Sequence, residues 1–135
     1  WIIADTGEKT PTRETVSAVR ALHAADSQRY DAIFKQIGYL TEKASRALKK
    51  GDLATLGWFM NQNQRLLKQL DVSSPKLDSL IQAALAAGAA GAKLSGGGRG
   101  GNMIALAGPE KLETIENALN QAGSARIITT KLTGG

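Results

Sequence analysis

Residues 91–106 read GAKLSGGGRGGNMIAL, and this stretch decides the fold. Glycine fills five of the six positions from 96 to 101, and Arg99 fills the other. The short apolar runs GAKLS and NMIALA lie on either side, and they predict two strands that the glycines connect. A flexible linker has no reason to lie between two apolar strands, so the flanks count against that interpretation.

Two other interpretations of the glycines remain. An ordinary hairpin would not need so many, because each glycine costs roughly 0.5–1 kcal/mol relative to alanine in regular structure. We therefore favour a loop that packs so closely against a ligand or another loop that side chains would collide. It is not a Walker loop, because GGGRGGN lacks the Gly-Lys-Ser/Thr ending and a strand follows. It is not a dinucleotide fingerprint either, because no helix follows directly, so we expect the loop to support a phosphate site made elsewhere.

The rest of the chain predicts an α+β fold. Apolar periodicity and capping residues indicate a strand at 1–5, helices beginning near Thr12, Ser27, Asp52 and Ser74, strands at 91–95 and 102–107, a helix over 108–123 and a strand over 125–132. This order indicates an antiparallel sheet of about four strands with helices packed on one face. It corresponds to a ferredoxin-like split βαβ pattern with a helical hairpin inserted after the first strand.

Capping residues predict four of these helix ends more closely. Gly51 suits the left-handed position after a helix and Asp52 the cap of the next one, so the two helices should form a tight antiparallel hairpin. Thr12 is the expected N-cap of the first helix. Ser74 followed by Pro75 is typical of a helix start. The polar run MNQNQR at 60–65 is expected to form a solvated helix face.

Composition limits the classes of function. A length of 135 residues suits one domain, and 42% hydrophobic with 21% charged residues is typical of a globular protein. The net charge of +5 comes from scattered side chains without a dense basic block, which gives nucleic-acid binding little support but suits an anionic small molecule. The lack of cysteine excludes disulfides and thiolate metal sites and favours a cytoplasmic location. No apolar run is long enough to span a bilayer, so no membrane partner is expected.

Three stretches together resemble one family. GAKLSGGGRGGN resembles the third motif of the GHMP kinase superfamily in its mevalonate-kinase form, which typically reads Gly-Ala-Lys-Leu/Met-Ser/Thr-Gly-Ala/Gly-Gly-x-Gly-Gly-Cys before an apolar strand. IIADTGEKTPTRE, at 2–14, resembles the strand of that family that ends in Asp-Thr-Gly and leads to a Thr-Arg/Lys pair. Residues 51–81 resemble the helices of that family. The resemblance covers essentially the whole chain.

The resemblance implies half of a two-domain enzyme. Such kinases hold the active site in a cleft, and the N-terminal domain carries the phosphate-binding loop, the catalytic aspartate and its partner lysine, none of which has a matching motif here. The chain also begins inside an apolar strand without methionine. We therefore expect residues 1–135 to be a single C-terminal domain from a longer chain, inactive alone, with the N-terminal domain and a small-molecule substrate as partners.

The implied reaction transfers the γ-phosphoryl group of ATP to the primary hydroxyl of mevalonate, with Mg²⁺, in isoprenoid biosynthesis. ATP and Mg²⁺ belong to the full-length enzyme, and this chain alone is not expected to hold either tightly. No catalytic or metal-binding residue is expected in it. By resemblance, Thr12 and Arg13 lie near the substrate, and the cleft loop consists of Ser95, Gly96, Gly97, Gly98, Arg99, Gly100 and Gly101.

Two residues depart from the family pattern. Arg99 stands where many relatives have glycine or an apolar residue, and Asn102 replaces the usual cysteine. Arg99 is expected either to contact an anionic substrate or to point to solvent, and both alternatives stay open. The departures leave room for another GHMP kinase, such as a phosphomevalonate kinase, or for a free-standing, non-catalytic binding module. An apolar face without its second domain also predicts self-association, for example a homodimer.

Overall fold

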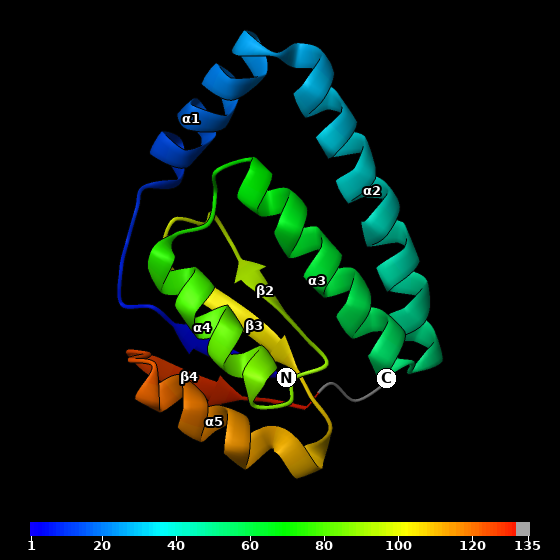
Figure 1. Cartoon of the computed structure of the whole chain (residues 1–135), viewed down its shortest axis with the longest axis vertical. Helices are drawn as coiled ribbons and strands as arrows, with labels where there is room; N and C mark the ends of the chain where they lie inside the picture. The colour runs from blue at the N-terminus through cyan, green and yellow to red at the C-terminus, as the bar shows by residue number, and fades with distance from the viewer. Residues whose placement is uncertain (132–135) are drawn as a thin grey trace.

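The computed structural model describes residues 1–131 of the chain and follows the predicted order of elements (Figure 1). The elements are β1 (Ile2–Asp5), α1 (Thr12–Ala25), α2 (Ser27–Lys50), α3 (Leu53–Gln69), α4 (Pro75–Ala86), β2 (Gly91–Ser95), β3 (Asn102–Leu106), a 3-10 turn (Pro109–Lys111), α5 (Leu112–Gln121) and β4 (Arg126–Thr129). The predicted last strand reached Leu132, which lies outside the described residues.

The four strands form one antiparallel sheet in the order β2-β3-β1-β4. This is the strand order of the ferredoxin-like pattern, so the predicted topology is confirmed. The hairpin register pairs Ser95 with Asn102 and Gly91 with Leu106, which leaves residues 96–101 to connect the strands. The six residues therefore form the loop at one end of the central hairpin.

Helices α4 and α5 cover one face of the sheet, in front of it in Figure 1. Alternation along β1 and β3 sends one set of side chains to these helices, among them Ile2, Ala4, Met103 and Ala105, which are all fully buried. The main core lies between the two layers, and its largest fully buried side chains are Ile2, Leu77, Leu80, Met103, Ile115 and Leu119.

The α2–α3 hairpin runs along the free edge of β2 (Figure 1). Its tight turn forms as predicted, because Gly51 has φ 68° and the Asp52 side chain accepts a hydrogen bond from the Thr55 amide at 3.1 Å. A smaller core joins the hairpin to the sheet through Ala47, Leu56, Met60 and Leu106. The insertion is thus held against the sheet rather than loosely attached.

One predicted helix start is wrong by one residue. Helix α1 begins at Thr12, its N-cap is Pro11, and no side chain caps it. Proline has a fixed φ near the helical value and no amide hydrogen, so it enters a helix readily without supplying a side-chain acceptor. By contrast, the Ser74 side chain caps α4 as predicted, through a 3.2 Å bond from the Leu77 amide.

Helix α3 touches the start of β2 backbone to backbone. A Cβ placed on Gly57 would lie 2.2 Å from the carbonyl oxygen of Ala90, and one placed on Gly91 would lie 2.5 Å from the Cα of Gly57. Both distances are far below a normal contact. The two glycines therefore allow an approach between helix and strand that no other residue type would permit.

Two helical amides bind the exposed edge of β2. Asn61 Oδ1 accepts from the Ala92 amide at 3.0 Å, and Gln64 Oε1 accepts from the Leu94 amide at 2.9 Å. The expectation that the MNQNQR run faces solvent is therefore wrong for these two residues. They lie one turn apart on α3, so they meet alternate amides of the strand. They satisfy donors that an edge strand otherwise leaves unpaired.

Among residues 1–131, no helix covers the second face of the sheet along β4. Ile128 is 44% exposed on this face. In the register Ile3 pairs with Ile128 on one side and with Ile104 on the other. The predicted homodimer would use such a surface, and it stays a prediction. In the described part of the chain, no helix is both long and apolar enough to cross a membrane.

The first prediction tests the helix–strand contact. Gly57→Ala should destabilise the protein by about 3 kcal/mol, because the methyl group meets the Ala90 backbone and α3 must move away from β2. Gly38→Ala in α2 is the matched control. It meets nothing within 4 Å, so it should stabilise the protein by roughly 0.5–1 kcal/mol. Urea unfolding followed by circular dichroism measures the free energy of unfolding of both variants. Equal changes in the two variants would contradict a close backbone contact at Gly57.

The second prediction tests the amide docking. Gln64→Met keeps the length of the side chain but leaves the Leu94 amide without its acceptor, so it should cost about 2 kcal/mol of unfolding free energy. Gln69→Met changes an exposed glutamine of the same helix and should stay within about 0.5 kcal/mol of wild type. A Gln64→Met variant as stable as the control would show that the bond contributes nothing.

Candidate functional site

The glycine loop, residues 95–101, is held on one side by residues 6–12, here called the N-terminal arm. The Thr6 amide and hydroxyl both donate to the carbonyl of Gly101, at 2.8 and 2.9 Å. The Gly101 amide donates to the carbonyl of Glu8 at 2.8 Å, and the Thr10 hydroxyl donates to the carbonyl of Arg99 at 2.7 Å. The arm thus binds the returning half of the loop at three points.

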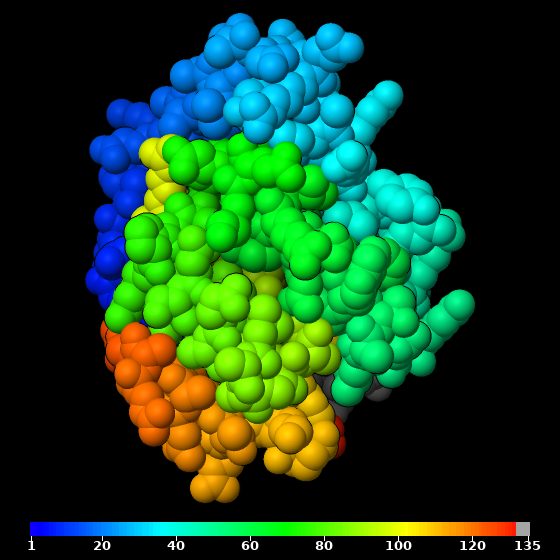
Figure 2. Space-filling view, viewed as in Figure 1, coloured from blue at the N-terminus to red at the C-terminus, as the bar shows by residue number. Residues whose placement is uncertain are grey.

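On the other side the loop meets the turn that follows α3. The Arg99 amide donates to the carbonyl of Val72 at 2.7 Å. A Cβ on Gly98 would lie 2.1 Å from the same carbonyl oxygen, and a Cβ on Gly100 would lie 2.9 Å from the carbonyl oxygen of Glu8. Figure 2 shows this part of the chain in yellow as a narrow strip between the blue arm and the green turn.

These contacts decide between the interpretations of the glycines. Gly98 and Gly100 also have φ of +80° and +115°, a region that side chains rarely adopt. Both positions therefore need glycine for conformation and for space. The loop packs against two other segments of this chain, which confirms the part of the favoured interpretation that named another loop.

The Arg99 side chain follows neither of the two expected alternatives. Its Nε donates to the carbonyl of Asp71 at 2.9 Å, and its Nη2 lies 3.1 Å from Asp71 Oδ2. The side chain is 29% exposed, so it lies along the surface instead of extending into solvent. Its guanidinium is already bound to a carboxylate and a carbonyl of this chain. The sequence contains no signal for this pairing, because the partners are 28 residues apart.

The structure brings Thr12 to the tip of the loop. A Cβ placed on Gly97 would lie 3.0 Å from Thr12 Oγ1. Arg13 follows in the first turn of α1, where it is exposed and makes no ion pair within residues 1–131. The amides of Gly96 and Gly97 on the exposed crest also have no hydrogen-bond partner among the described residues.

The arrangement suits an anion. The first amides of a helix carry partial positive charge, and α1 has no side chain that caps them. The Arg13 guanidinium, the Thr12 hydroxyl and the free amides of the loop crest add donors at the same end of the sheet. The acidic residue of this first turn, Glu14, is exposed. Phosphate and carboxylate are the groups that such a set of donors recognises.

Lys93 belongs to the same motif but lies on β2, before the loop. Its Nζ donates to the carbonyl of Leu94 at 2.8 Å. Burial lowers the pKa of Lys93 below the usual value of a lysine. No carboxylate pairs with it in the described part of the chain.

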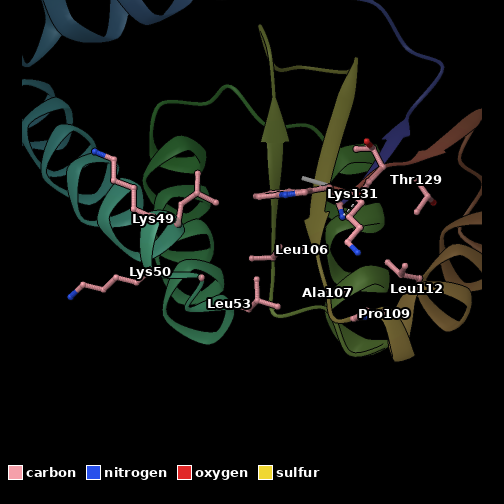
Figure 3. Close-up of a pocket in the computed structure, with 13 residues that line it drawn as sticks. Lys49, Lys50, Leu53, Leu106, Ala107, Pro109, Leu112, Thr129 and Lys131 are labelled. Carbon is pink, nitrogen blue, oxygen red and sulfur yellow. Dashed lines mark hydrogen bonds between the residues drawn. The ribbon is translucent and has the colours of Figure 1, made fainter. Parts of the chain in front are cut away.

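A well-formed hollow lies at the opposite end of the sheet. It has a volume of about 960 Å³, and its walls include Leu48, Leu53, Leu106 and Leu112. Figure 3 shows that the Lys49 and Lys50 side chains extend away from the labelled apolar residues. Thr129 and Lys131 also line the hollow, but the motif residues of the glycine loop do not, so we assign the candidate site to the loop end instead.

Residues 1–131 contain no group of three or more His, Cys, Asp or Glu side chains that could hold a metal ion. We assign no magnesium ligand to this chain and derive no step through the ion.

Comparison with known proteins adds the family to this geometry. The family model described as GHMP kinases C terminal matches residues 44–125, which include α3, α4 and the glycine loop. The chain belongs to this family. The GHMP kinase resemblance of the sequence motifs and the predicted fold class are both confirmed.

The proteins similar to this GHMP kinase domain include mevalonate kinases. The chain is 38% identical over 133 residues to the mevalonate kinase of Pyrococcus furiosus, an alignment that covers 95% of the chain and 40% of the relative. The crystal structure of L. major mevalonate kinase in complex with R-mevalonate superposes with a TM-score of 0.90 at 33% identity, over 94% of the chain and 40% of that protein. The Methanococcus jannaschii mevalonate kinase superposes with a TM-score of 0.76 at 32% identity, over 94% and 37%. The chain thus spans about 40% of the length of these relatives.

The third prediction tests the packing of the loop. Gly98→Ala should destabilise the protein by about 3 kcal/mol, because its methyl group collides with Val72 and its φ is unfavourable. Gly96→Ala is the control, since it has φ +92° but nothing within 4 Å, and it should cost only about 1–2 kcal/mol. Urea unfolding of both variants checks this. A Gly96→Ala variant that is the less stable of the two would show that conformation alone, not contact, demands glycine.

Proposed function

We propose that this GHMP kinase domain is the C-terminal, substrate-side part of an enzyme that transfers the γ-phosphoryl group of ATP to mevalonate. The observation that carries the proposal is the meeting of Thr12 with the glycine loop at one end of the sheet, in a chain 38% identical to a mevalonate kinase over 95% of its length. The similar L. major structure contains R-mevalonate, an acid with a carboxylate and a primary hydroxyl.

In this proposal the chain supplies binding and orientation. Arg13, the Thr12 hydroxyl and the uncapped amides of α1 attract the carboxylate of the acceptor. The Gly96 and Gly97 amides, which have no hydrogen-bond partner among residues 1–131, would supply partial positive charge to the transferring group. Phosphoryl transfer depends mostly on such positioning and charge stabilisation. The general base and the nucleotide phosphate loop are proposed to lie in the N-terminal part of the enzyme.

The position of Arg99 favours mevalonate over a phosphorylated acceptor. The phosphomevalonate alternative rested on the departures at Arg99 and Asn102, and in this structure the Arg99 guanidinium is paired with Asp71. The Streptococcus pneumoniae phosphomevalonate kinase is 19% identical with a TM-score of 0.76, a likeness of fold alone. The same proposal includes ATP with Mg²⁺ as the cofactor of the full-length enzyme. It also includes a cytoplasmic location, which the absence of cysteine supports.

The fourth prediction concerns the activity. The protein encoded by the whole open reading frame that contains this chain should release ADP from ATP with mevalonate, whereas the purified 135-residue chain should not. Thr12→Val removes an exposed hydroxyl near the loop and should raise the KM for mevalonate about tenfold or more, with the KM for ATP unchanged. Coupled ADP assays measure each constant.

Thr41→Val is the matched control, because it removes a hydroxyl of α2 that donates to the carbonyl of Ile37, at an exposed position. It should leave both constants unchanged. Turnover by the 135-residue chain alone, or faster turnover with phosphomevalonate than with mevalonate, would overturn the proposal. An open reading frame that begins at this domain would favour the non-catalytic binding module.

A further inference from the structure

The geometry points to Arg99 as a positioning residue. In this inference, which rests on the proposed function, the Arg99–Asp71 pair sets the glycine loop and the N-terminal arm at a fixed distance and does not touch the substrate. Arg99 departs from the usual pattern of the motif. A loop with glycine at this position would have no side chain to pair with Asp71.

The first support is the way α3 ends. The Asp71 amide donates to the carbonyl of Lys68 at 3.0 Å and the Val72 amide to the carbonyl of Leu67 at 3.4 Å, with Asp71 at φ 58°. This is a Schellman ending, with Asp71 in the left-handed position that glycine normally takes and Val72 buried behind it. The end of the helix is therefore well defined, and its free carbonyls attract a cation.

The second support is the number of segments that meet at Arg99. Its amide binds Val72, its side chain binds Asp71, and its carbonyl accepts from Thr10 of the N-terminal arm. One residue thus joins the end of α3, the glycine loop and the arm. The arm continues into Thr12 and Arg13, so a change at Arg99 is transmitted to the proposed substrate groups.

The third support is conformational. Arg99 and Asp71 are the two residues other than glycine with positive φ among residues 1–131, and they bind each other. A side chain in this region costs about 1–2 kcal/mol relative to glycine. An arginine is retained there only where its contacts offset that cost. The guanidinium fork, which reaches a carbonyl and a carboxylate together, supplies such contacts.

The test uses glycine replacements, since glycine adopts positive φ without strain. Arg99→Gly, Asp71→Gly and the double variant are made in the protein encoded by the whole open reading frame. Hydrogen–deuterium exchange is followed on the peptides that contain the Gly101 and Thr6 amides, with the peptide that contains the Leu94 amide as internal control. Arg65→Gly would disturb its helix, so Arg65→Ala, which removes an exposed arginine of α3, is the charge control.

We expect exchange at Gly101 and Thr6 to rise about tenfold in Arg99→Gly and less in Asp71→Gly, while Leu94 stays protected through its bond to Gln64. The double variant should match Arg99→Gly, because the pair acts as one unit. Asp71→Asn keeps an acceptor and tolerates positive φ, so it should resemble wild type. Unchanged exchange at Gly101 in Arg99→Gly would overturn the inference.

A kinetic comparison separates positioning from substrate contact. Arg99→Gly and Asp71→Gly should both lower kcat/KM for mevalonate and leave the KM for ATP unchanged, because both would act through Thr12 and Arg13. A selective rise for one substrate in Arg99→Gly, with Asp71→Gly unchanged, would show direct binding and refute the positioning role. A wild-type protein without mevalonate kinase activity would refute the proposed function. The exchange experiment would still test whether the Arg99–Asp71 pair positions the loop.

Discussion

The backbone contact between α3 and β2 is the constraint on which the rest of the structure depends. Gly57 and Gly91 let helix and strand approach until only backbone separates them, and Asn61 with Gln64 then binds the amides of the strand edge. An edge strand with free amides would be open to wrong pairing. Here the inserted hairpin closes that edge, so the insertion becomes part of the layer that supports the site.

Because α3 is held along β2, its C-terminal end arrives at the glycine loop. The turn at Asp71 and Val72 then forms one wall of the loop, and the N-terminal arm forms the other. Side chains are excluded at Gly98 and Gly100 because both walls are backbone. The exposed crest at Gly96 and Gly97 keeps free amides beside Thr12, which places the proposed anion site next to the part of the loop that both walls hold.

Much of the fold could be predicted from the sequence. The order of elements, the Gly51 turn and the Ser74 cap follow from local signals that span a few residues, and the structure confirms them. The error at Asn61 and Gln64 has a distant cause, because these residues look like a solvated face until β2 lies beside them. The error at the start of α1 is local, because Pro11 and not Thr12 occupies the capping position.

The sequence by itself indicated the family, the α+β class and a glycine-rich loop at residues 96–101, because motif, periodicity and composition are properties of neighbouring residues. Only the tertiary structure decided what the glycines touch and where the one arginine among them goes. Arg99 could have reached a ligand or solvent, and its choice of Asp71 depends on a helix end 28 residues earlier in the chain. No local sequence pattern predicts this pairing, because Arg99 and Asp71 come together only when α3 packs on β2.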